Sequence, residues 1–214
     1  MNKGRIAIYS SSSESIPAVY FQAAHALCAE AAQRGWGMVY GAGQLGLMGE
    51  CARTMREQGA EIHGVIPEAL NVPGVVYEDC TTLTVTKTMG ERKKLMEDMA
   101  DAFIALPGSF GTMEELFEVI TLKQLGYHHK AIVLLNVGGY FDSLLAQIQK
   151  FMDEGFTRAD SSTMYFVAND EKQALDYIER YRPVKLIPKW MKAPEEEGAA
   201  KEDVCAGSSA DARQ

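Results

Sequence analysis

Two glycine-rich segments of this sequence have the composition of anion-binding turns. They are GAGQLGLMG at residues 41–49 and LPGSFGTMEE at residues 106–115, each between an apolar run and a predicted helix. Glycines allow close backbone approach, and the first turn of a helix presents unpaired N–H groups at its positive end. Such turns bind phosphate. A tight turn without a ligand is the alternative, but four glycines in nine residues exceed what the turn at 41–49 requires.

A third segment, TMGERKK at residues 88–94, carries positive charge at a predicted helix start. Thr88 and Glu91 have the spacing of a capping box, which predicts a helix N-terminus at Thr88. The basic side chains of residues 92–94 then lie near the positive end of the helix, where each cation costs roughly 0.3–1 kcal/mol. A bound phosphate would reverse that cost, and a solvated basic surface is the alternative. Arg92 is the best candidate for a bidentate contact, because its guanidinium is planar.

Acidic side chains crowd one helix that is otherwise apolar. The spacing puts Glu114, Glu118 and Thr121 on one face, with Glu115 beside it. Such acids are costly on an apolar helix unless they face a ligand cleft. Thr112 and Glu115 also have capping-box spacing, so a second interpretation is that Glu115 only caps its own helix.

Several other chemistries are disfavoured by spacing. The G-x-G-x-x-G match at residues 41–46 follows the second predicted strand, Glu61 opens the next strand instead of ending it, and the Walker A lysine is absent. NAD and ATP are therefore disfavoured, and a redox enzyme stays a third alternative. Pro107 stands where a nucleophile elbow around Ser109 needs glycine. The four cysteines and four histidines lack metal-site spacing, so no metal is predicted.

The composition is that of a folded globular chain. Of 214 residues, 47% are hydrophobic and 23% are charged. We expect one domain over residues 1–189, and a disordered acidic tail over residues 190–214, which are rich in Ala, Gly, Glu and Ser. The net charge of −8 argues against a nucleic-acid partner. No apolar run approaches the ~20 residues of a membrane span. The absence of a signal-peptide pattern and the scattered cysteines favour a cytoplasmic location.

The elements that must position these residues are short apolar strands alternating with longer helices. Strands are predicted at residues 5–9, 36–40, 61–66, 83–86, 102–106, 131–135 and 165–167. Helices are predicted at residues 17–34, 50–58, 88–100, 112–125, 140–152 and 171–181. This alternation predicts an α/β protein with a parallel sheet covered on both faces. Because the carboxyl ends of parallel strands share one edge, both glycine-rich turns should meet there around one phosphorylated ligand.

The segments GAGQLGLMG, MGERKKLM and PGSFGTMEELFEVITLKQLGYHHKAIVLLN resemble the LOG family of cytokinin riboside 5′-monophosphate phosphoribohydrolases. The resemblance covers roughly residues 4–180, and the PGGxGTxxE pattern with an upstream Arg-Lys pair is specific. It implies a Rossmann-like, doubly wound, mainly parallel sheet in a homodimer. It also implies hydrolysis of the N-glycosidic bond of a nucleoside 5′-monophosphate, AMP or N6-substituted AMP, to free base and ribose 5-phosphate. This reaction needs neither a metal nor a cofactor.

The resemblance also implies roles for individual residues. The catalytic arginine and glutamate fall on Arg92 and Glu115. Substrate contacts are expected from Gly43, Gly46, Met89, Lys93, Gly108, Ser109, Phe110, Gly111, Thr112, Met113, Glu114 and Thr121. Ser109 replaces the second glycine of the pattern, and Gly90 stands where histidine is common. A lysine decarboxylase, a label once given to many relatives, has no support in the residues. A non-catalytic carrier of nucleotides or molybdenum cofactor with the same fold is the alternative function.

Overall fold

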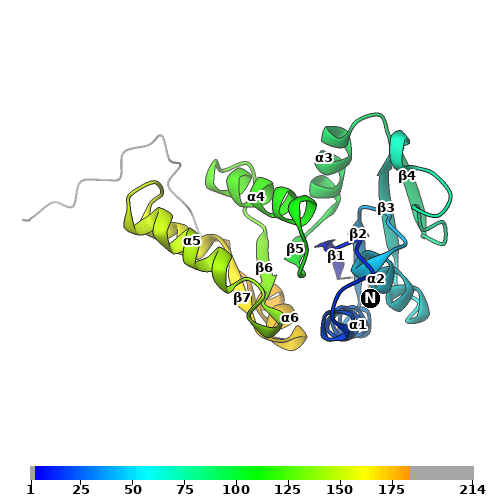
Figure 1. Ribbon diagram of the computed structural model, residues 1–214, viewed down its shortest axis with the longest axis horizontal. Coiled ribbons are helices and arrows are strands. Elements are labelled where there is room, and N and C mark those ends of the chain that lie inside the picture. Colours follow the sequence, from blue (N-terminus) through cyan, green and yellow to red (C-terminus); the bar gives the residue numbers. More distant parts are fainter. Residues whose placement is uncertain (1–2, 184–214) are drawn as a thin grey trace, which may run out of the picture.

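The structure, a computed structural model, describes residues 3–183 and contains one seven-stranded sheet (Figure 1). The strands lie in the order β4-β3-β2-β1-β5-β6-β7, and every neighbouring pair is parallel. They are β1 (Gly4–Tyr9), β2 (Trp36–Tyr40), β3 (Ile62–Pro67), β4 (Thr82–Thr86), β5 (Ala102–Ala105), β6 (Ala131–Leu135) and β7 (Phe166–Ala168). The predicted Rossmann-like, doubly wound α/β fold is confirmed.

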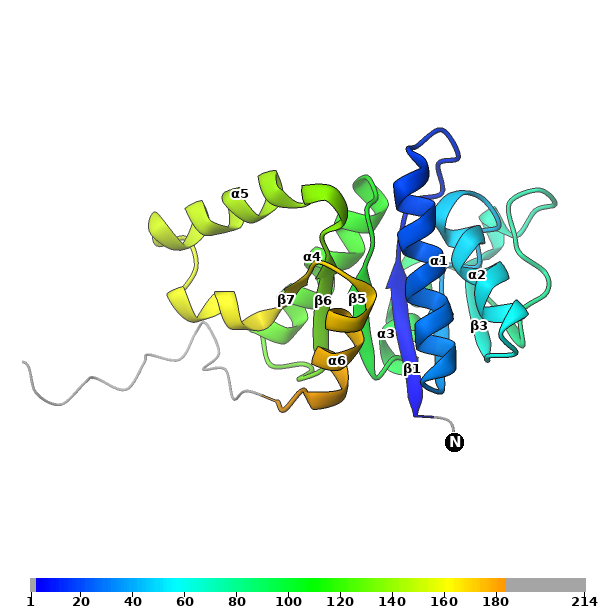
Figure 2. The same ribbon diagram turned by 90° about the horizontal axis from the view of Figure 1, so that it is seen from below.

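Within residues 3–183, six α-helices cover both faces of the sheet. They are α1 (Ala18–Gln33), α2 (Gly46–Glu57), α3 (Met89–Met99), α4 (Phe110–Gln124), α5 (Asp142–Asp153) and α6 (Glu171–Arg180). Helices α1, α2 and α6 lie on one face, which Figure 2 shows in front, and α3 and α4 lie on the other. None of the helices within residues 3–183 combines the length and the apolarity that crossing a membrane requires.

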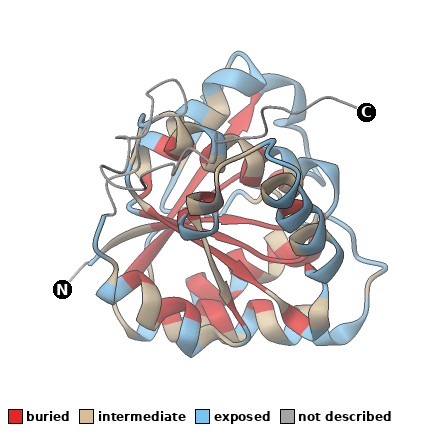
Figure 3. Ribbon diagram, turned by 90° about the vertical axis from the view of Figure 1, so that its left-hand side faces the viewer, coloured by how far each residue is buried: buried red, intermediate tan, exposed pale blue. Residues whose placement is uncertain are grey.

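Strands β2, β3, β5 and β6 are buried along their whole length, because helices cover both of their faces (Figure 3). The edge strand β4 is exposed or half-buried, and three of its five residues are threonines. Alternate side chains of a strand enter opposite layers. In β1, Ile6 and Ile8 join the core under α1, α2 and α6, whereas Ala7 and Tyr9 join the core under α3, α4 and α5. We call these layers the first core and the second core. A shift of one residue in the pairing of a strand would move its side chains from one core into the other. The two cores therefore fix the register of each strand.

The connections reverse direction between β1 and β5. The chain leaves β1 for α1 on one face and leaves β5 for α4 on the other. The two strands are neighbours, with Tyr9 opposite Ala105 and the Leu106 N–H donating to the Tyr9 carbonyl at 2.9 Å. In open parallel sheets, ligands bind at the carboxyl ends of strands beside such a reversal. The fold therefore predicts a ligand site at the carboxyl edge of the sheet, between β1 and β5.

Three predicted helix starts are wrong by two residues or more. Helix α5 begins at Asp142 instead of residue 140, and the other two starts lie in the glycine-rich segments. Helix α2 begins at Gly46 instead of residue 50, and α4 begins at Phe110 instead of residue 112. Because glycine has a low helix propensity, the sequence predicts that α2 begins after Gly49. In the structure, packing against the sheet lets the helix begin earlier, at Gly46. The predicted tail, residues 190–214, lies outside the described residues.

Candidate active site

A cleft of about 420 Å³ lies at the carboxyl edge of the sheet and brings the predicted segments together. Its polar side comes from the turn after β1, the glycine-rich turns after β2 and β5, one residue of α3 and the first two turns of α4. Its apolar side comes from α2, the end of β3 and the segment after β3. The lining residues are Ser10, Ser11, Ser12, Gly41, Gly43, Leu45, Met48, Ile66, Leu70, Val75, Arg92, Ser109, Gly111, Thr112 and Glu115.

The turn after β2 is held in place by the segment that follows β3. The Gln44 N–H donates to the Val75 carbonyl at 2.9 Å, and the Tyr77 N–H donates to the Ala42 carbonyl at 2.8 Å. Ala42 has a φ of 57°, which is rare for a residue with a side chain. Gly41 is required by close contact, because a Cβ there would lie 1.8 Å from the Arg92 Nη2 atom. The glycine thus opens the space across which the Arg92 guanidinium lies.

Arg92 and Glu115 form an ion pair inside the cleft. The Arg92 Nη2 atom donates to the Glu115 Oε1 atom at 3.0 Å, and the two side chains are only 12% and 11% exposed. Thr88 caps α3 as predicted, since its hydroxyl accepts from the Glu91 N–H at 3.1 Å. That cap sets the first turn of α3, from which Arg92 projects. The structure thus brings the candidate arginine and the candidate glutamate together in one cleft.

The ion pair does not hold Glu115 in a strongly acidic state. Burial raises the pKa of its carboxyl to about 7, although the positive charge of Arg92 lowers the pKa. The negative charges of Glu114 and Glu118 raise it further, and Lys93 lowers it. A carboxyl that titrates near neutrality in a cleft can act as a general base at physiological pH.

The start of α4 offers free backbone donors to the cleft. Ser109 is its N-cap residue and makes no side-chain capping bond, so the first N–H groups of α4 are not capped by this side chain. Thr112 is the third residue of the helix and only 3% exposed. The interpretation of Thr112 and Glu115 as a capping box is therefore wrong, because Thr112 is not the N-cap. Glu115 faces the cleft instead.

Tyr140 fixes the turn before α4 and was not anticipated from the sequence. Its hydroxyl donates to the Gly108 carbonyl at 2.7 Å, and its ring packs edge-on against Tyr20, with the ring centroids 5.6 Å apart. A Cβ at Gly108 would lie 2.0 Å from the Thr112 Oγ1 atom, so the turn also requires glycine there. No local sequence pattern predicts this contact, because Tyr140 lies 32 residues after Gly108 in the chain.

Six of the predicted site residues line the cleft and eight do not. Those that line it are Gly43, Arg92, Ser109, Gly111, Thr112 and Glu115. Those outside the lining are Gly46, Met89, Lys93, Gly108, Phe110, Met113, Glu114 and Thr121. Substrate contact by the second set stays a prediction.

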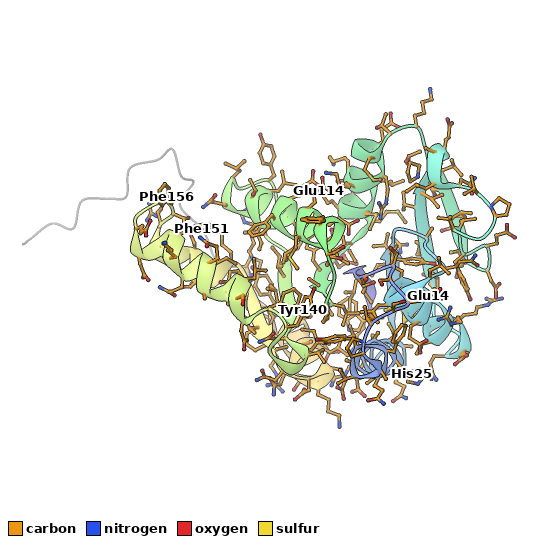
Figure 4. The ribbon with its side chains drawn as sticks, viewed as in Figure 1. Glu14, His25, Glu114, Tyr140, Phe151 and Phe156 are labelled. Carbon is orange, nitrogen blue, oxygen red and sulfur yellow. The ribbon has the colours of Figure 1, made fainter. Side chains whose placement is uncertain are left out.

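Several of the residues outside the lining have other contacts. Lys93 pairs with Glu114 and also with Glu118, the latter at 2.9 Å, which ties α3 to α4. Figure 4 labels Glu114 on the side of α4 that faces α3. The Met89 Sδ atom accepts from Arg92 Nη1 at 3.1 Å. A Cβ at Gly46, whose φ is 58°, would lie 2.5 Å from the Ser12 carbonyl carbon, so Gly46 packs the turn after β1.

The apolar side of the cleft was missed by reasoning from the sequence. Its side chains are Leu45, Met48, Ile66, Leu70 and Val75. Leu45 and Met48 lie within the glycine-rich segment, where position alone could have indicated them.

Among the residues described, no group of three or more His, Cys, Asp or Glu side chains is placed to hold a metal ion.

Comparison with known proteins identifies relatives along most of the chain. A family model described as "Possible lysine decarboxylase" matches residues 48–178. LOGL3 of Oryza sativa subsp. japonica, a probable cytokinin riboside 5′-monophosphate phosphoribohydrolase, is 40% identical over 84% of this chain and 85% of its own. The chain belongs to the LOG family. LOG2 of Arabidopsis thaliana, named as a cytokinin riboside 5′-monophosphate phosphoribohydrolase, is also 40% identical, with 84% of each chain covered.

Solved structures share the fold of this LOG-family chain. The molybdenum cofactor carrier protein of Chlamydomonas reinhardtii superposes with a TM-score of 0.64 at 21% identity, and 84% of this chain and 98% of that chain are covered. The molybdenum cofactor binding protein of Rippkaea orientalis gives a TM-score of 0.64 at 19% identity, with 84% and 97% covered. At such identities the likeness shows the fold alone.

Proposed function

We propose that this protein hydrolyses the N-glycosidic bond of a nucleoside 5′-monophosphate, AMP or an N6-substituted AMP, to the free base and ribose 5-phosphate. The buried pair of Arg92 and Glu115 in the cleft carries the proposal. The relatives that are named as phosphoribohydrolases support it, because they match 84% of this chain. Lysine decarboxylation, which the family description mentions, is not supported by the cleft, because none of its lining residues is a lysine that could form a Schiff base.

Glu115 acts on the carbon that loses the base. As the C1′–N bond breaks, positive charge develops on the ribose, as in other glycoside cleavage. The Glu115 carboxylate stabilises that charge and takes a proton from the water that attacks C1′. The pKa of about 7 leaves this carboxyl ionised in half of the molecules at neutral pH. Arg92 keeps the carboxylate in place and holds the substrate, and its positive charge assists departure of the base.

The glycine-rich turns hold the 5′-phosphate. The uncapped first turn of α4 supplies N–H groups and the positive end of the helix dipole, and Ser109, Gly111 and Thr112 line the cleft there. Binding the phosphate at this fixed point orients the ribose relative to Glu115. The free energy of binding the phosphate, which does not itself react, thereby helps to hold C1′ in the position for reaction.

The apolar side of the cleft suits the base. Leu45, Leu70 and Val75 are each more than one-third exposed although they line the cleft, so an apolar group bound there would cover them. A purine packs against such side chains, and an alkyl group on its N6 atom extends the contact. This supports N6-substituted AMP as a substrate beside AMP itself, and with it a role in the formation of free cytokinins.

The test is incubation of the purified protein with a panel of nucleoside 5′-monophosphates, followed by chromatography for free base. We expect adenine from AMP and the free N6-substituted base from its analogue. Glu115→Gln should keep the fold and lose at least a hundredfold in kcat, in line with the loss of a general base. Tight nucleotide binding by the wild-type protein without release of base would instead favour the carrier function.

The assembly and location follow from the same family. We infer a homodimer in the cytoplasm, without a nucleic-acid partner. Phe110, which is 93% exposed at the start of α4, and Met89, which is 41% exposed on α3, give an apolar surface that a second subunit can cover. Light scattering on the purified protein gives the mass of the assembly, and a monomer at micromolar concentration would contradict the inference.

A further inference from the structure

Ser10 carries a hydrogen-bonding group that the protein itself does not use. It is the first residue after β1, at the reversal of direction beside β5, and it lines the cleft. The residue is 9% exposed, and its hydroxyl is buried with no hydrogen-bond partner among the described residues. An unpaired buried hydroxyl is unfavourable by roughly 1–3 kcal/mol. Its neighbour Ser11, by contrast, accepts a hydrogen bond from the Ser13 N–H at 3.0 Å.

The cleft has a buried floor and an exposed mouth. Ser10 and Glu115 are each 9% exposed and form the floor. Ser109 and Gly111, at the start of α4, are exposed and lie toward the mouth. A phosphate bound by the first turn of α4 therefore sits nearer the mouth than the floor. The carbon that reacts with Glu115 must lie over the floor, and so must the sugar that contains it.

We infer that the Ser10 hydroxyl forms a hydrogen bond with a hydroxyl of the substrate's ribose, an inference that rests on the proposed function. Ser10 can donate and accept in the same position, as a neutral sugar hydroxyl requires. The turn that carries it is rigid, because the Met48 N–H donates to the Ser11 carbonyl at 3.2 Å. Ser10 therefore positions the ribose with C1′ beside the Glu115 carboxylate, while the turn at α4 holds the phosphate.

The experiment combines a protein variant with altered substrates. The enzyme and its Ser10→Ala variant are assayed with AMP, 2′-deoxy-AMP and 3′-deoxy-AMP. We expect Ser10→Ala to lower kcat/KM for AMP roughly three- to tenfold, the effect of one neutral hydrogen bond. With at least one deoxynucleotide the variant and the wild type should be equal, because the ribose partner is already missing. An equal loss with all three nucleotides, or no loss with AMP, overturns the inference.

Two controls separate this contact from a structural role. Ser13→Ala changes an exposed serine of the same turn that does not line the cleft, and it should leave kcat/KM unchanged. Ser10→Ala should not lower the Tm, because the variant removes a buried hydroxyl without a partner in the protein. A Tm several degrees lower would show that the hydroxyl has a structural partner, and would overturn the inference.

A failure of the proposed function gives a different result. If the wild-type protein releases no base from AMP, the phosphoribohydrolase proposal fails, and turnover no longer tests Ser10. Calorimetric Kd values of AMP and its two deoxy analogues, for the wild type and Ser10→Ala, then test the contact directly. The same pattern is expected, with weaker binding of AMP and equal binding of one analogue. Equal Kd values for AMP in both proteins count against the contact.

Discussion

The ionisation of Glu115 predicts how the activity depends on pH. Burial raises the pKa of this carboxyl to about 7, and the carboxylate is the active form in the proposed mechanism. Activity must therefore rise as the pH rises through this value. A carboxyl with this pKa is half ionised at pH 7 and about one-tenth ionised at pH 6. We expect kcat/KM to fall roughly fivefold from pH 7 to pH 6.

Two neighbouring charges allow this pKa to be moved in opposite directions without altering the carboxyl itself. The negative charge of Glu114 raises the pKa of Glu115, and the positive charge of Lys93 lowers it. Glu114→Gln should therefore move the rise in kcat/KM to lower pH, and Lys93→Met should move it to higher pH. Each shift should be roughly half a pH unit, because a partly exposed charge contributes on the order of 1 kcal/mol or less.

The assay is the initial rate of adenine release from AMP between pH 5 and pH 9 at constant ionic strength. The phosphate of AMP itself ionises near pH ~6, which adds to the profile of every variant equally. The comparison therefore uses the difference between profiles, which belongs to the protein. Profiles that coincide for the wild type, Glu114→Gln and Lys93→Met, or that shift in one direction for both variants, would refute Glu115 as the titrating group.

Three further predictions concern other parts of the site. Gly41→Ala places a Cβ 1.8 Å from Arg92 Nη2, so kcat/KM should fall at least tenfold while the circular dichroism spectrum is kept; full activity would show that the guanidinium can lie elsewhere. Leu70→Ser should lower kcat/KM several-fold more for N6-isopentenyl-AMP than for AMP, and equal losses would place the alkyl group elsewhere. Thr88→Ala should lower the free energy of unfolding in urea by about 1 kcal/mol through loss of the α3 cap, and an unchanged midpoint would contradict this.

The inner strands were predictable because their burial is nearly complete. The predicted bounds of β2 and β6 match the structure, and all five residues of each strand are buried. Such strands are apolar without interruption, so the sequence marks their limits. The starts of α2 and α4 were less predictable, because Gly46 and Gly111 lower local helix propensity, whereas tertiary packing decides where the helix begins.

The polar half of the site was also predictable, for a different reason. Arg92 and Glu115 lie in the first two turns of the helices that follow β4 and β5, and parallel strands bring their carboxyl ends to one edge. The apolar half depends on the path of the segment after β3, which crosses to the glycine-rich turn through the hydrogen bond from Gln44 N–H to the Val75 carbonyl. No periodic pattern encodes such a long-range contact, so Leu70 and Val75 were not expected in the cleft.

The cleft stands between helices that rest on different cores. Met48 and the rest of α2 pack with the first core, whereas α3 and α4 pack on the second. A substitution that leaves a void in only one core, such as Leu27→Ala on the buried face of α1, therefore relaxes one side of the cleft and leaves the other in place. Substitutions in one core can in this way alter the distance between the parts of the cleft proposed for the base and for the sugar, while the residues that line the cleft stay the same.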